Sequence, residues 1–343
     1  MTSCYQFAVF FFLQMVFGFI LFSYYKGNNQ YSPSEPKPTV LPSRSETPQI
    51  ILLWTWPFGN PFPLNQCPSS SAYLGCWFTA DRKYYSSAKA IVFHHRDVCV
   101  SRNQMPQEPR PPGQYWVWFN LESPSHSPNL RFMDDLINIT MTYRLDSDIF
   151  SPYGFLLQHN SSKSFTIPEK SKLVAWVVSN WNPNSRRVQL YEELKKYIQI
   201  DVYGRQHIPL QGQITDTISK YKFYLSFENS IHKDYITEKF WSNALNSGTV
   251  PVVLGPPREN YEKFAPRDSF IHVDDFPNAK QLAEYLLQLD KDTEKYQKYF
   301  QWRSRLETNK DGEWWADHYC KVCKFLKEAP AYRSIANLEK WYT

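Results

Sequence analysis

Several charged side chains occupy positions where α/β proteins place their chemistry. Glu238 and Lys239 fall in the first turn of a helix that follows the predicted strand 222–227 and a polar elbow. Arg186 and Arg187 fall in the first turn of the helix predicted over 184–197. A cation is unfavourable there by roughly 0.3–1 kcal/mol, because a helix N-terminus already carries partial positive charge. For Lys239 alone, pairing with Glu238 or solvent explains the position as well as an anion does. Two such helix starts favour a shared anion such as a diphosphate.

A carboxylate follows another predicted strand, at 115–121. Glu122 comes at the carboxyl end of this strand, the side of an open sheet where α/β proteins bind their ligands. The aromatic run beside it could raise the pKa of a carboxyl group, which suits a general base. A helix cap or loop cap is the more common role for such a glutamate. The residue alone leaves both interpretations open.

Metal and nucleotide motifs are weak in this chain. No glycine-rich phosphate loop occurs, and with 11 glycines any phosphate binding must rest on helix ends and side chains. The triplet Asp146-Ser147-Asp148 could hold a divalent metal, but Arg144 offers an ordinary salt partner. The pair His94-His95 lacks a second ligand at helical spacing and is expected to be structural.

The elements that must position these groups alternate along the chain. Short apolar runs bounded by polar or turn residues predict strands, and apolar residues at helical spacing predict helices. The expected strands are 49–58, 90–94, 115–121, 173–178, 198–203, 222–227, 250–254 and 270–273. The expected helices are 184–197, a segment from 237 to about 247, 279–289 and 293–303. This alternation predicts two α/β domains with a crevice between them.

The amino-acid composition limits the classes of protein to which this chain can belong. The chain has 343 residues, enough for two domains, and 42% of them are hydrophobic, which excludes global disorder. The net charge of +5 is spread along the chain without a basic run. A nucleic-acid partner is therefore not expected.

The first residues predict a membrane anchor. Residues 7–22 are uncharged and almost wholly apolar, and tyrosines extend the segment to 25, close to the ~20 residues that a membrane span needs. A cleaved signal peptide is the alternative, but no small-residue cleavage site follows. We expect a cytosolic tail at 1–6, a transmembrane signal anchor at 7–25 and a proline-rich stem at 26–48. The flanking charges do not orient the anchor.

Glycosylation sequons and cysteines point to a lumenal location. Asn138 and Asn160 begin N-x-S/T triplets. Beyond the stem the cysteines are Cys67, Cys76, Cys99, Cys320 and Cys323, and their spacing does not suit zinc. If the two outer pairs form two disulfides, these close long loops, nominally worth ~4–5 kcal/mol on the chain-entropy model. Four cysteines allow three connectivities, and Cys99 is left over.

Longer motifs carry a family resemblance. The segments FYLSFENSIHKDYITEKFW and VPVVLGPPRENYEKFAPRDSFIHVDDF, with WPFG, HHRD, FNLESPSHSP, TYRLDSDIFSPYGF, WVVSNWNP and NLEKWY, cover about residues 49–343. They closely resemble the Golgi α-1,3-fucosyltransferases of the Lewis type, glycosyltransferase family 10. The resemblance implies a single-pass type II Golgi membrane protein with a GT-B fold, in which two Rossmann-like domains face a central cleft. It implies GDP-fucose as donor and glycans ending in N-acetyllactosamine as acceptor.

The same resemblance assigns roles in an inverting single displacement. Glu122 matches the general base that takes the proton of the GlcNAc 3-hydroxyl, and Arg187 and Lys239 match the cations that neutralise the departing diphosphate. No metal is essential in such enzymes, so the triplet at Asp146 becomes structural. The positions that match the donor pocket, besides Arg187 and Lys239, are Tyr153, Ser179, Asn180, Tyr224, Glu228, Asn229, Tyr235 and Glu238.

Acceptor residues and disulfides are also implied by the resemblance. Asn60, Arg96 and Glu122 match acceptor-side positions, although relatives can have Gln where Asn60 stands. Arg96 resembles members that prefer type 2 chains and make Lewis x products; use of type 1 chains as well, or an inactive lectin-like relative, is the alternative. The implied bridges are Cys67–Cys320 and Cys76–Cys323. A metal-dependent enzyme with a GT-A fold, resting on Asp146 and Asp148, is a further alternative.

The expected domains follow from these assignments. An acceptor-binding Rossmann-like domain is expected at 49–165, and a GDP-fucose-binding Rossmann-like domain at 166–343, with its C-terminal segment tied back to the first. Assembly as a homodimer stays open.

Overall fold

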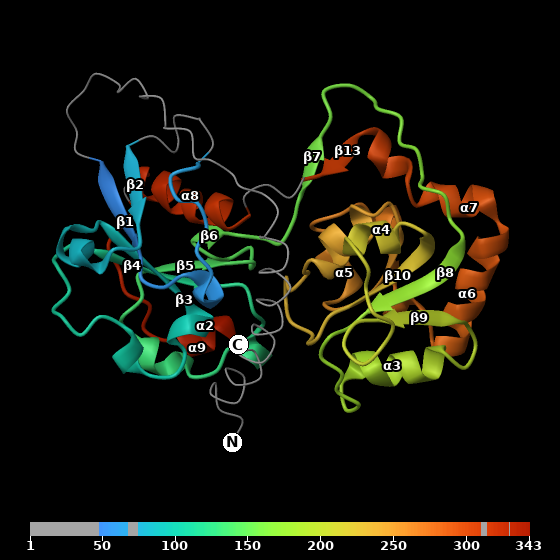
Figure 1. The fold of residues 1–343 in the computed structure, drawn as a ribbon, viewed down its shortest axis with the longest axis horizontal. Helices are drawn as coiled ribbons and strands as arrows, with labels where there is room; N and C mark the ends of the chain where they lie inside the picture. Colours follow the sequence, from blue (N-terminus) through green and yellow to red (C-terminus); the bar gives the residue numbers. More distant parts are fainter. Residues whose placement is uncertain (1–47, 68–74, 310–313, 329) are drawn as a thin grey trace, which may run out of the picture. The chain divides into compact units, whose positions relative to one another are not determined.

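The structure, a computed structural model, describes residues 48–67, 75–309, 314–328 and 330–343 (Figure 1). The predicted tail, the anchor and nearly all of the stem lie outside the described residues. Within the described ranges, no helix has the length and apolar character needed to cross a membrane.

The chain divides into two compact units. Unit 1 comprises the chain up to Asn120, His126–Thr140 and Trp315–Thr343, and unit 2 comprises Leu121–Ser125 and Met141–Trp314. The expected boundary at 165 differs from this division, because the segment that begins at Met141 packs with unit 2. The functions assigned to the two domains stay a prediction.

The first sheet has the strand order β2-β1-β3-β4-β5-β6. Its strand pairs β1–β2, β1–β3, β3–β4 and β5–β6 are parallel. Every residue of β3 and β4 is buried, as expected for parallel strands that are covered on both faces. The strands are β1 Gln49–Leu53, β2 Cys76–Thr79, β3 Ala90–His94, β4 Tyr115–Asn120, β5 Ile139–Thr142 and β6 Ile149–Phe150.

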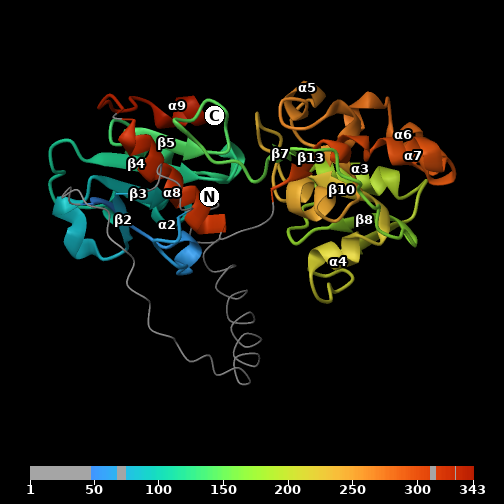
Figure 2. The same cartoon turned by 90° about the horizontal axis from the view of Figure 1, so that it is seen from above.

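Helices near the C-terminus cover both faces of the first sheet (Figure 2). The neighbouring residues Trp118 and Phe119 of β4 point to opposite faces. The ring of Phe119 lies 5.4 Å from that of Tyr319 in α8 (Trp314–Lys327), and the ring of Trp118 lies 4.8 Å from that of Tyr342 in α9 (Leu338–Tyr342). The last residues of the chain therefore complete the core of unit 1.

Two disulfides fix α8 to the start of unit 1. Cys67 pairs with Cys320 and Cys76 with Cys323, with Cα–Cα distances of 5.6 and 6.0 Å. Cys320 and Cys323 are three residues apart in a helix and so lie on one face. The pairing implied by the family resemblance is confirmed.

Asn138, the first residue of a predicted sequon, is buried beside β4. It is 2% exposed, its Oδ1 accepts from the backbone N of Trp116, and its Nδ2 donates to the carbonyl of Arg333. The attachment of a glycan at Asn138 stays a prediction. Asn160 is exposed, and its use as an acceptor stays a prediction.

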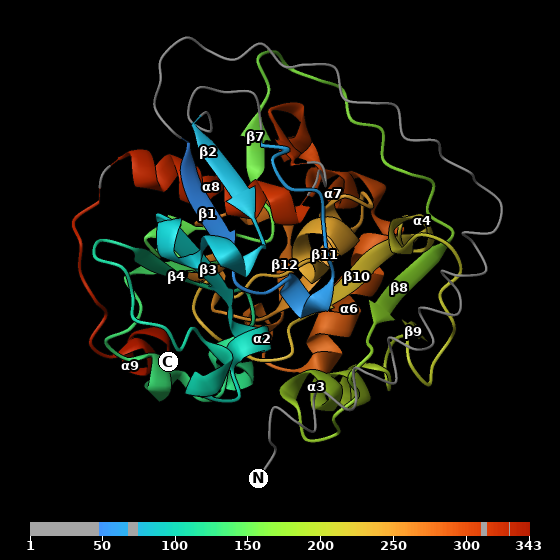
Figure 3. The ribbon, with the colours of Figure 1, turned by 60° about the vertical axis from the view of Figure 1, so that its left-hand side comes forward.

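The second sheet has the strand order β12-β11-β10-β8-β9 and is parallel throughout (Figure 3). If the five strands are numbered by their order in the chain and read from β9 to β12, the sheet has the order 2-1-3-4-5, which is a doubly wound arrangement. The strands are β8 Lys172–Val177, β9 Ile200–Tyr203, β10 Tyr221–Phe227, β11 Val250–Leu254 and β12 Ile271–His272. A separate antiparallel ribbon pairs β7 (Leu156–Gln158) with β13 (Leu306–Thr308).

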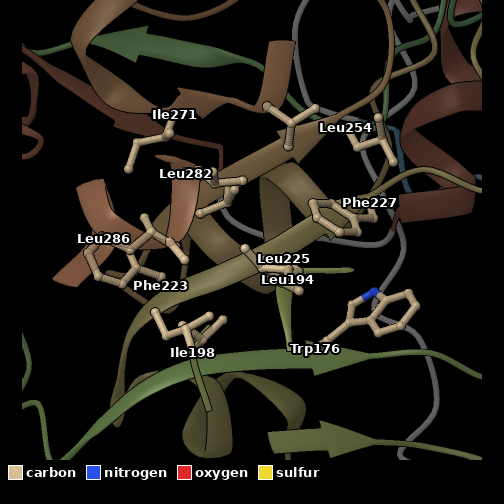
Figure 4. Packing of buried hydrophobic residues seen from close by; sticks show 14 of the residues in the cluster. Trp176, Leu194, Ile198, Phe223, Leu225, Phe227, Leu254, Ile271, Leu282 and Leu286 are labelled. Atoms are coloured by element: carbon tan, nitrogen blue, oxygen red, sulfur yellow. The ribbon is translucent and has the colours of Figure 1, made fainter. Parts of the chain in front are cut away.

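Alternate residues of β10 face two different cores. Phe223, Leu225 and Phe227 pack with α3 (Arg186–Leu194) and α6 (Ala279–Lys291) on one face (Figure 4). Tyr224 lies on the other face, where η7 (Lys239–Leu245) supplies Ala244. The predicted helix after residue 237 is present as η7, but it is wound as a π-helix: the backbone N of Asn243 donates to the carbonyl of Glu238, five residues earlier.

The helical segments of the described residues are mostly short. They are η1 Pro57–Gly59, η3 Arg82–Ser87, α2 His95–Val98, η4 Arg102–Gln104, η5 Pro124–His126, η6 Leu130–Met133, α3 Arg186–Leu194, α4 Ile214–Ile218, η7 Lys239–Leu245, α5 Arg258–Tyr261, η8 Arg267–Ser269, η9 Val273–Asp275, α6 Ala279–Lys291, α7 Thr293–Lys298 and η10 Gln301–Ser304, besides α8 and α9.

Candidate active site

The strand order of unit 2 locates a ligand site. The chain reverses its direction of winding between β8 and β10, and open α/β sheets bind ligands beyond the carboxyl ends of the strands at such a point. Ser179 and Asn180 follow the end of β8, and Glu228 and Asn229 follow the end of β10. The structure therefore brings these predicted donor residues to one edge of one sheet.

Arg187 is a buried cation at this edge. It is the second residue of α3 and is 6% exposed. Its Nη2 donates to the carbonyl of Asn180, whereas its Nε is buried and has no hydrogen-bond partner among the described residues. Burial lowers the pKa of Arg187, although the charge of Glu228 acts in the opposite direction. A buried guanidinium with an unused donor fits an anionic ligand.

Glu228 organises the start of η7. The carboxylate is 2% exposed and accepts from the backbone N of Thr237 at 2.8 Å and from its hydroxyl at 3.0 and 2.9 Å. Burial raises the pKa of Glu228, and the nearby Lys239 ammonium opposes this shift. Thr237 is a residue that the sequence analysis missed; its place directly before Glu238 in the polar elbow was the only signal.

Lys239 lies between two carboxylates. Its Nζ is 2.9 Å from Thr237 Oγ1, 3.0 Å from Glu238 Oε1 and 3.3 Å from Glu228 Oε2. Burial acts to lower the pKa of Lys239, but the charges of Glu228 and Glu238 outweigh it, and the pKa is raised. The side chain is therefore a fixed positive charge, and the pairing with Glu238, which was the alternative to an anion, is present.

Glu238 is the more exposed of the two carboxylates. Its side chain is half-exposed. Burial acts to raise its pKa, but the Lys239 ammonium outweighs this effect and the pKa of Glu238 lies below its usual value. Glu238 is therefore ionised at neutral pH.

Tyrosines surround this group. Tyr235 is buried, with its ring 5.1 Å from that of Tyr143 and 6.4 Å from that of Tyr153. Burial raises the pKa of both Tyr153 and Tyr235 well above the usual value, with a smaller contribution from the charge of Glu122. Tyr224 is fully buried in β10 and accepts from Asn243 Nδ2 at 3.2 Å, so it supports η7 from the core.

Glu122 lies on a segment that packs with unit 2. The expected first domain, 49–165, contained this residue, but Leu121–Ser125 belongs to unit 2. Tyr153 donates from its hydroxyl to the carbonyl of Leu121 at 2.6 Å, and Ser230 Oγ bonds Ser123 Oγ at 2.6 Å. These bonds tie the half-buried Glu122 to the segment that follows β10.

The predicted acceptor residues Asn60 and Arg96 lie in unit 1. Asn60 is exposed, and its Nδ2 donates to the carbonyl of Phe58 at 3.3 Å. Arg96 follows β3 in α2 and donates from Nη1 to the carbonyl of His126 at 3.2 Å. They follow β1 and β3, between which the first sheet reverses its winding.

A pocket that the sequence analysis missed lies at the same edge of the first sheet. Its volume is about 370 Å³. The Arg82 guanidinium lies 3.9 Å from the centre of the Trp54 ring, and Asp97 Oδ2 lies 2.6 Å from His94 Nδ1. The motifs WPFG and HHRD were the available signal, because they supply Trp56, Gly59 and Asp97 to the lining.

The triplet at Asp146 forms ion pairs. The Asp146 carboxylate accepts from Arg144 at 2.8 and 2.7 Å and from Lys233 Nζ at 3.2 Å. The hydrogen bond from Arg144 outweighs partial burial and lowers the pKa of Asp146 to about 2. Among the residues with described side chains, no cluster of three metal-ligating groups occurs.

A doubly wound α/β unit with fixed cations beyond its carboxyl edge is typical of proteins that bind phosphorylated ligands. Family models give the class. The model for the N-terminal part of fucosyltransferases matches residues 46–154, and the model for the C-terminal part of glycosyltransferase family 10 (fucosyltransferase) matches residues 167–341. The chain belongs to glycosyltransferase family 10.

Individual relatives agree with this class. The chain is 48% identical over 342 residues to 4-galactosyl-N-acetylglucosaminide 3-alpha-L-fucosyltransferase FUT6 of Pongo pygmaeus, covering 96% of this chain and 94% of that one. It is 46% identical over 336 residues to 4-galactosyl-N-acetylglucosaminide 3-alpha-L-fucosyltransferase 9 of Bos taurus, covering 94% and 92%. A crystal structure of an alpha1,3-fucosyltransferase with GDP-fucose is similar in fold, with a TM-score of 0.54, 18% identity, and coverage of 87% of this chain and 96% of that one.

Proposed function

We propose that this protein transfers L-fucose from GDP-β-L-fucose to the 3-hydroxyl of GlcNAc in N-acetyllactosamine, with inversion at the anomeric carbon, and so makes Lewis x-type α-1,3-fucosides. One observation carries the proposal: the segment with Glu122 is hydrogen-bonded to Ser230 and Tyr153, within the same unit as the buried cation Arg187. The names of the relatives that share almost the whole chain support the substrates.

Each charged side chain has one task in this reaction. Glu122 accepts the proton of the acceptor hydroxyl while the oxygen forms a bond to C1 of fucose. The bond between C1 and the diphosphate oxygen breaks, and its electron pair leaves with GDP. Arg187 and Lys239 stabilise the charge that develops on the diphosphate. Glu238, ionised beside Lys239, is assigned to the fucose hydroxyls and to the positive charge that develops on the sugar.

The finer architecture belongs to the same proposal. We assign the two units to a GT-B fold, with an acceptor-binding first domain and a GDP-fucose-binding second domain. The chain has two separate doubly wound sheets, which supports this assignment. The apolar segment 7–25 and the stem support a single-pass type II protein of the Golgi membrane, with its catalytic part in the lumen.

A fixed cation pair also supports a reaction without an essential metal, because Arg187 and Lys239 supply positive charge where other glycosyltransferases use a divalent ion. The test uses the full chain in detergent with GDP-fucose and excess EDTA. We expect the fucoside of N-acetyllactosamine to form under chelation. Complete loss of activity, restored by Mn²⁺ or Mg²⁺, would contradict the metal-free mechanism.

A second acceptor class has one observation in its favour. A 3-galactosyl-N-acetylglucosaminide 4-alpha-L-fucosyltransferase FUT3 of Pongo pygmaeus is 43% identical over 352 residues. An acceptor panel of type 1, type 2 and sialylated type 2 glycans separates the two functions. We expect at least tenfold preference for type 2, and equal use of type 1 would replace the proposal with an α-1,3/4-fucosyltransferase.

A further inference from the structure

A second polar pocket of unit 2 lies at the opposite edge of its sheet. Its volume is about 450 Å³, and its lining includes His159, Lys163, Ser164, Thr215 and Arg303. Arg303 bonds the carbonyl of Leu245, which comes shortly before β11 begins. The pocket thus lies near the amino ends of the strands, whereas Arg187 and Glu228 follow carboxyl ends.

Arg303 is the central group of this pocket. It is 8% exposed, and its guanidinium carbon lies 4.2 Å from the centre of the Phe165 ring and 4.4 Å from that of Trp302. Its Nη2 donates to the carbonyl of Leu245, but its Nε is buried without a partner in the described part of the chain. No carboxylate of the described residues forms an ion pair with it. A buried cation without a counter-charge is costly unless an anion accompanies it.

Further cationic groups crowd the same region. Lys170 donates from Nζ to the carbonyls of Ser219 and Gly248, at 2.7 Å each. The pKa of Lys170 is lowered to about 7, mainly because the side chain is buried and to a smaller extent because of the charge of Arg303. The two side chains therefore repel each other when both are charged, and a negative group near Arg303 would relieve this repulsion.

The rim offers additional donors. The Nδ1 of His159 is buried and unpartnered among the described residues, and it lies 3.7 Å from Glu307 Oε1, beyond hydrogen-bonding distance. Lys163 Nζ lies 3.5 Å from Glu307 Oε2. Glu307 is the acidic member of the lining, against Arg303, Lys163 and His159. Neutral donors come from Ser164, Thr215, Asn246 and Thr308.

We propose that this pocket binds a tetrahedral oxyanion, a phosphate or sulfate group, held by Arg303 and Lys163. Such a group matches the planar guanidinium fork and the hydroxyl donors of the lining. The volume exceeds that of one ion, so the group can be a free ion or an ester carried on a sugar. Backbone bonds from His159 to Arg305 and from Lys163 to Ser304 already join the two chain segments that the anion would bridge.

The experiment measures thermal unfolding of the full chain in detergent, with inorganic phosphate replacing chloride at constant ionic strength. At phosphate concentrations ten times the dissociation constant, we expect a rise of about 3 °C in the wild type. Arg303→Met should abolish the rise. Arg186→Met, which removes an exposed arginine of the same unit, should leave it unchanged.

The donor site needs a separate control, because it also attracts phosphate. Arg187→Met should retain the phosphate response if the second pocket binds the ion. If Arg187→Met loses the response and Arg303→Met retains it, the phosphate binds at the donor site. This outcome overturns the proposal for the second pocket but agrees with the proposed function. If Arg303→Met does not fold, Lys163→Gln with His159→Gln should lower phosphate affinity at least fivefold, and an unchanged affinity equally overturns the proposal.

The source of the anion is distinguished by titration calorimetry with inorganic sulfate, GlcNAc 6-sulfate and GlcNAc. Tighter binding of the sugar sulfate than of sulfate, dependent on Arg303, assigns the pocket to an esterified glycan. Tighter binding of the free ion, with the same dependence, assigns it to soluble phosphate or sulfate. Binding of both that is unaffected by Arg303→Met contradicts the oxyanion site.

Discussion

At the scale of single residues, two carboxylates of the candidate site, Glu228 and Glu238, both contact Lys239. Glu228 is buried and accepts from both the backbone N and the hydroxyl of Thr237, whereas Glu238 is half-exposed and bonds Lys239 and the side chain of Thr237. A buried carboxylate with several donors is costly to disturb, and an exposed pair contributes little to stability. Glu228 therefore fixes the geometry of Lys239, and Glu238 is the carboxylate that is free to exchange its partner for substrate.

Glu122→Gln tests the general base. The amide keeps the shape of the side chain but cannot accept a proton, so we expect kcat to fall by roughly 10²–10⁴-fold. GDP affinity, measured by calorimetry, should stay within about twofold, because Glu122 is not among the groups that bind the diphosphate. A parallel loss of affinity and turnover would make Glu122 a structural residue.

The neighbouring arginines of α3 form a matched pair. Arg187 is buried with an unused donor, and Arg186 is exposed and paired with Asp274 at 2.5 Å. Arg187→Met should weaken GDP binding by roughly 10–100-fold, because it removes a charge-assisted hydrogen bond that contributes about 1.5–3 kcal/mol. Arg186→Met should change it less than twofold. Similar effects of both substitutions would exclude a specific role for Arg187.

At the scale of elements, one reciprocal pair holds the loop between β10 and η7. Asp234 has a left-handed backbone with φ of 61°. Its backbone N donates to Asn260 Oδ1 at 2.7 Å, and Asn260 Nδ2 donates back to Asp234 Oδ1 at 2.6 Å. The pair sets the direction in which the chain enters Tyr235 and the site residues that follow.

Asn260→Ala should lower the free energy of unfolding by about 2–3 kcal/mol, because it leaves two buried polar groups of Asp234 unpaired. A double-mutant cycle with Asp234→Ala, followed by urea unfolding, should give a coupling of about 0.5–3 kcal/mol. The exposed Asn184→Ala serves as control and should change stability by less than about 0.5 kcal/mol. Additive effects would show that the pair does not act as a unit.

Lys170 gives the second sheet a pH dependence. Its pKa is about 7 in the folded protein, against an ordinary value of 10.5. Between these values the unfolded chain binds a proton that the folded chain does not, so the free energy of unfolding rises with pH in this window. Lys170→Met should reduce the rise, measured by urea unfolding at pH 7 and 9 in phosphate-free buffer; the rest comes in part from Lys321, where burial lowers the pKa to about 8. The exposed Lys163→Met should keep it; the same slope in Lys170→Met would contradict the assignment.

At the scale of the whole molecule, the sequence predicts the sheet cores better than their edges. The strands 90–94 and 250–254 coincide with β3 and β11, because an unbroken apolar run has no stable place except between two covered faces. The ribbon of β7 and β13 was missed, because three-residue strands with partly exposed side chains carry no such run. The π-winding of η7 was missed too, because the apolar residues of 239–245 have the spacing of an ordinary helix.

The candidate site shows the same limit. Position at a strand end made Glu122 a candidate without deciding between a base and a cap, and the two cationic helix starts made Arg187 and Lys239 candidates for an anion site. The role of Glu122 and the other donor and acceptor positions required the long family motifs. Two tertiary facts were out of reach. Asn138, the first residue of a sequon, is buried beside β4 and bonds the backbone of Trp116. Glu122 follows a strand of the first sheet, yet hydrogen bonds to Tyr153 and Ser230 draw its segment into unit 2.

The two disulfides have a consequence for biosynthesis. Cys67 and Cys76 leave the ribosome long before their partners, Cys320 and Cys323, which lie 253 and 247 residues further along the chain. The long continuous stretch Met141–Trp314 of unit 2 is complete before either bond can form. Unit 1, although it begins the chain, must therefore close last. A stop codon in place of Cys320 would remove both bonds, the greater part of α8 and all of α9. Such a truncation spares every candidate catalytic residue, yet it would leave unit 1 unable to close.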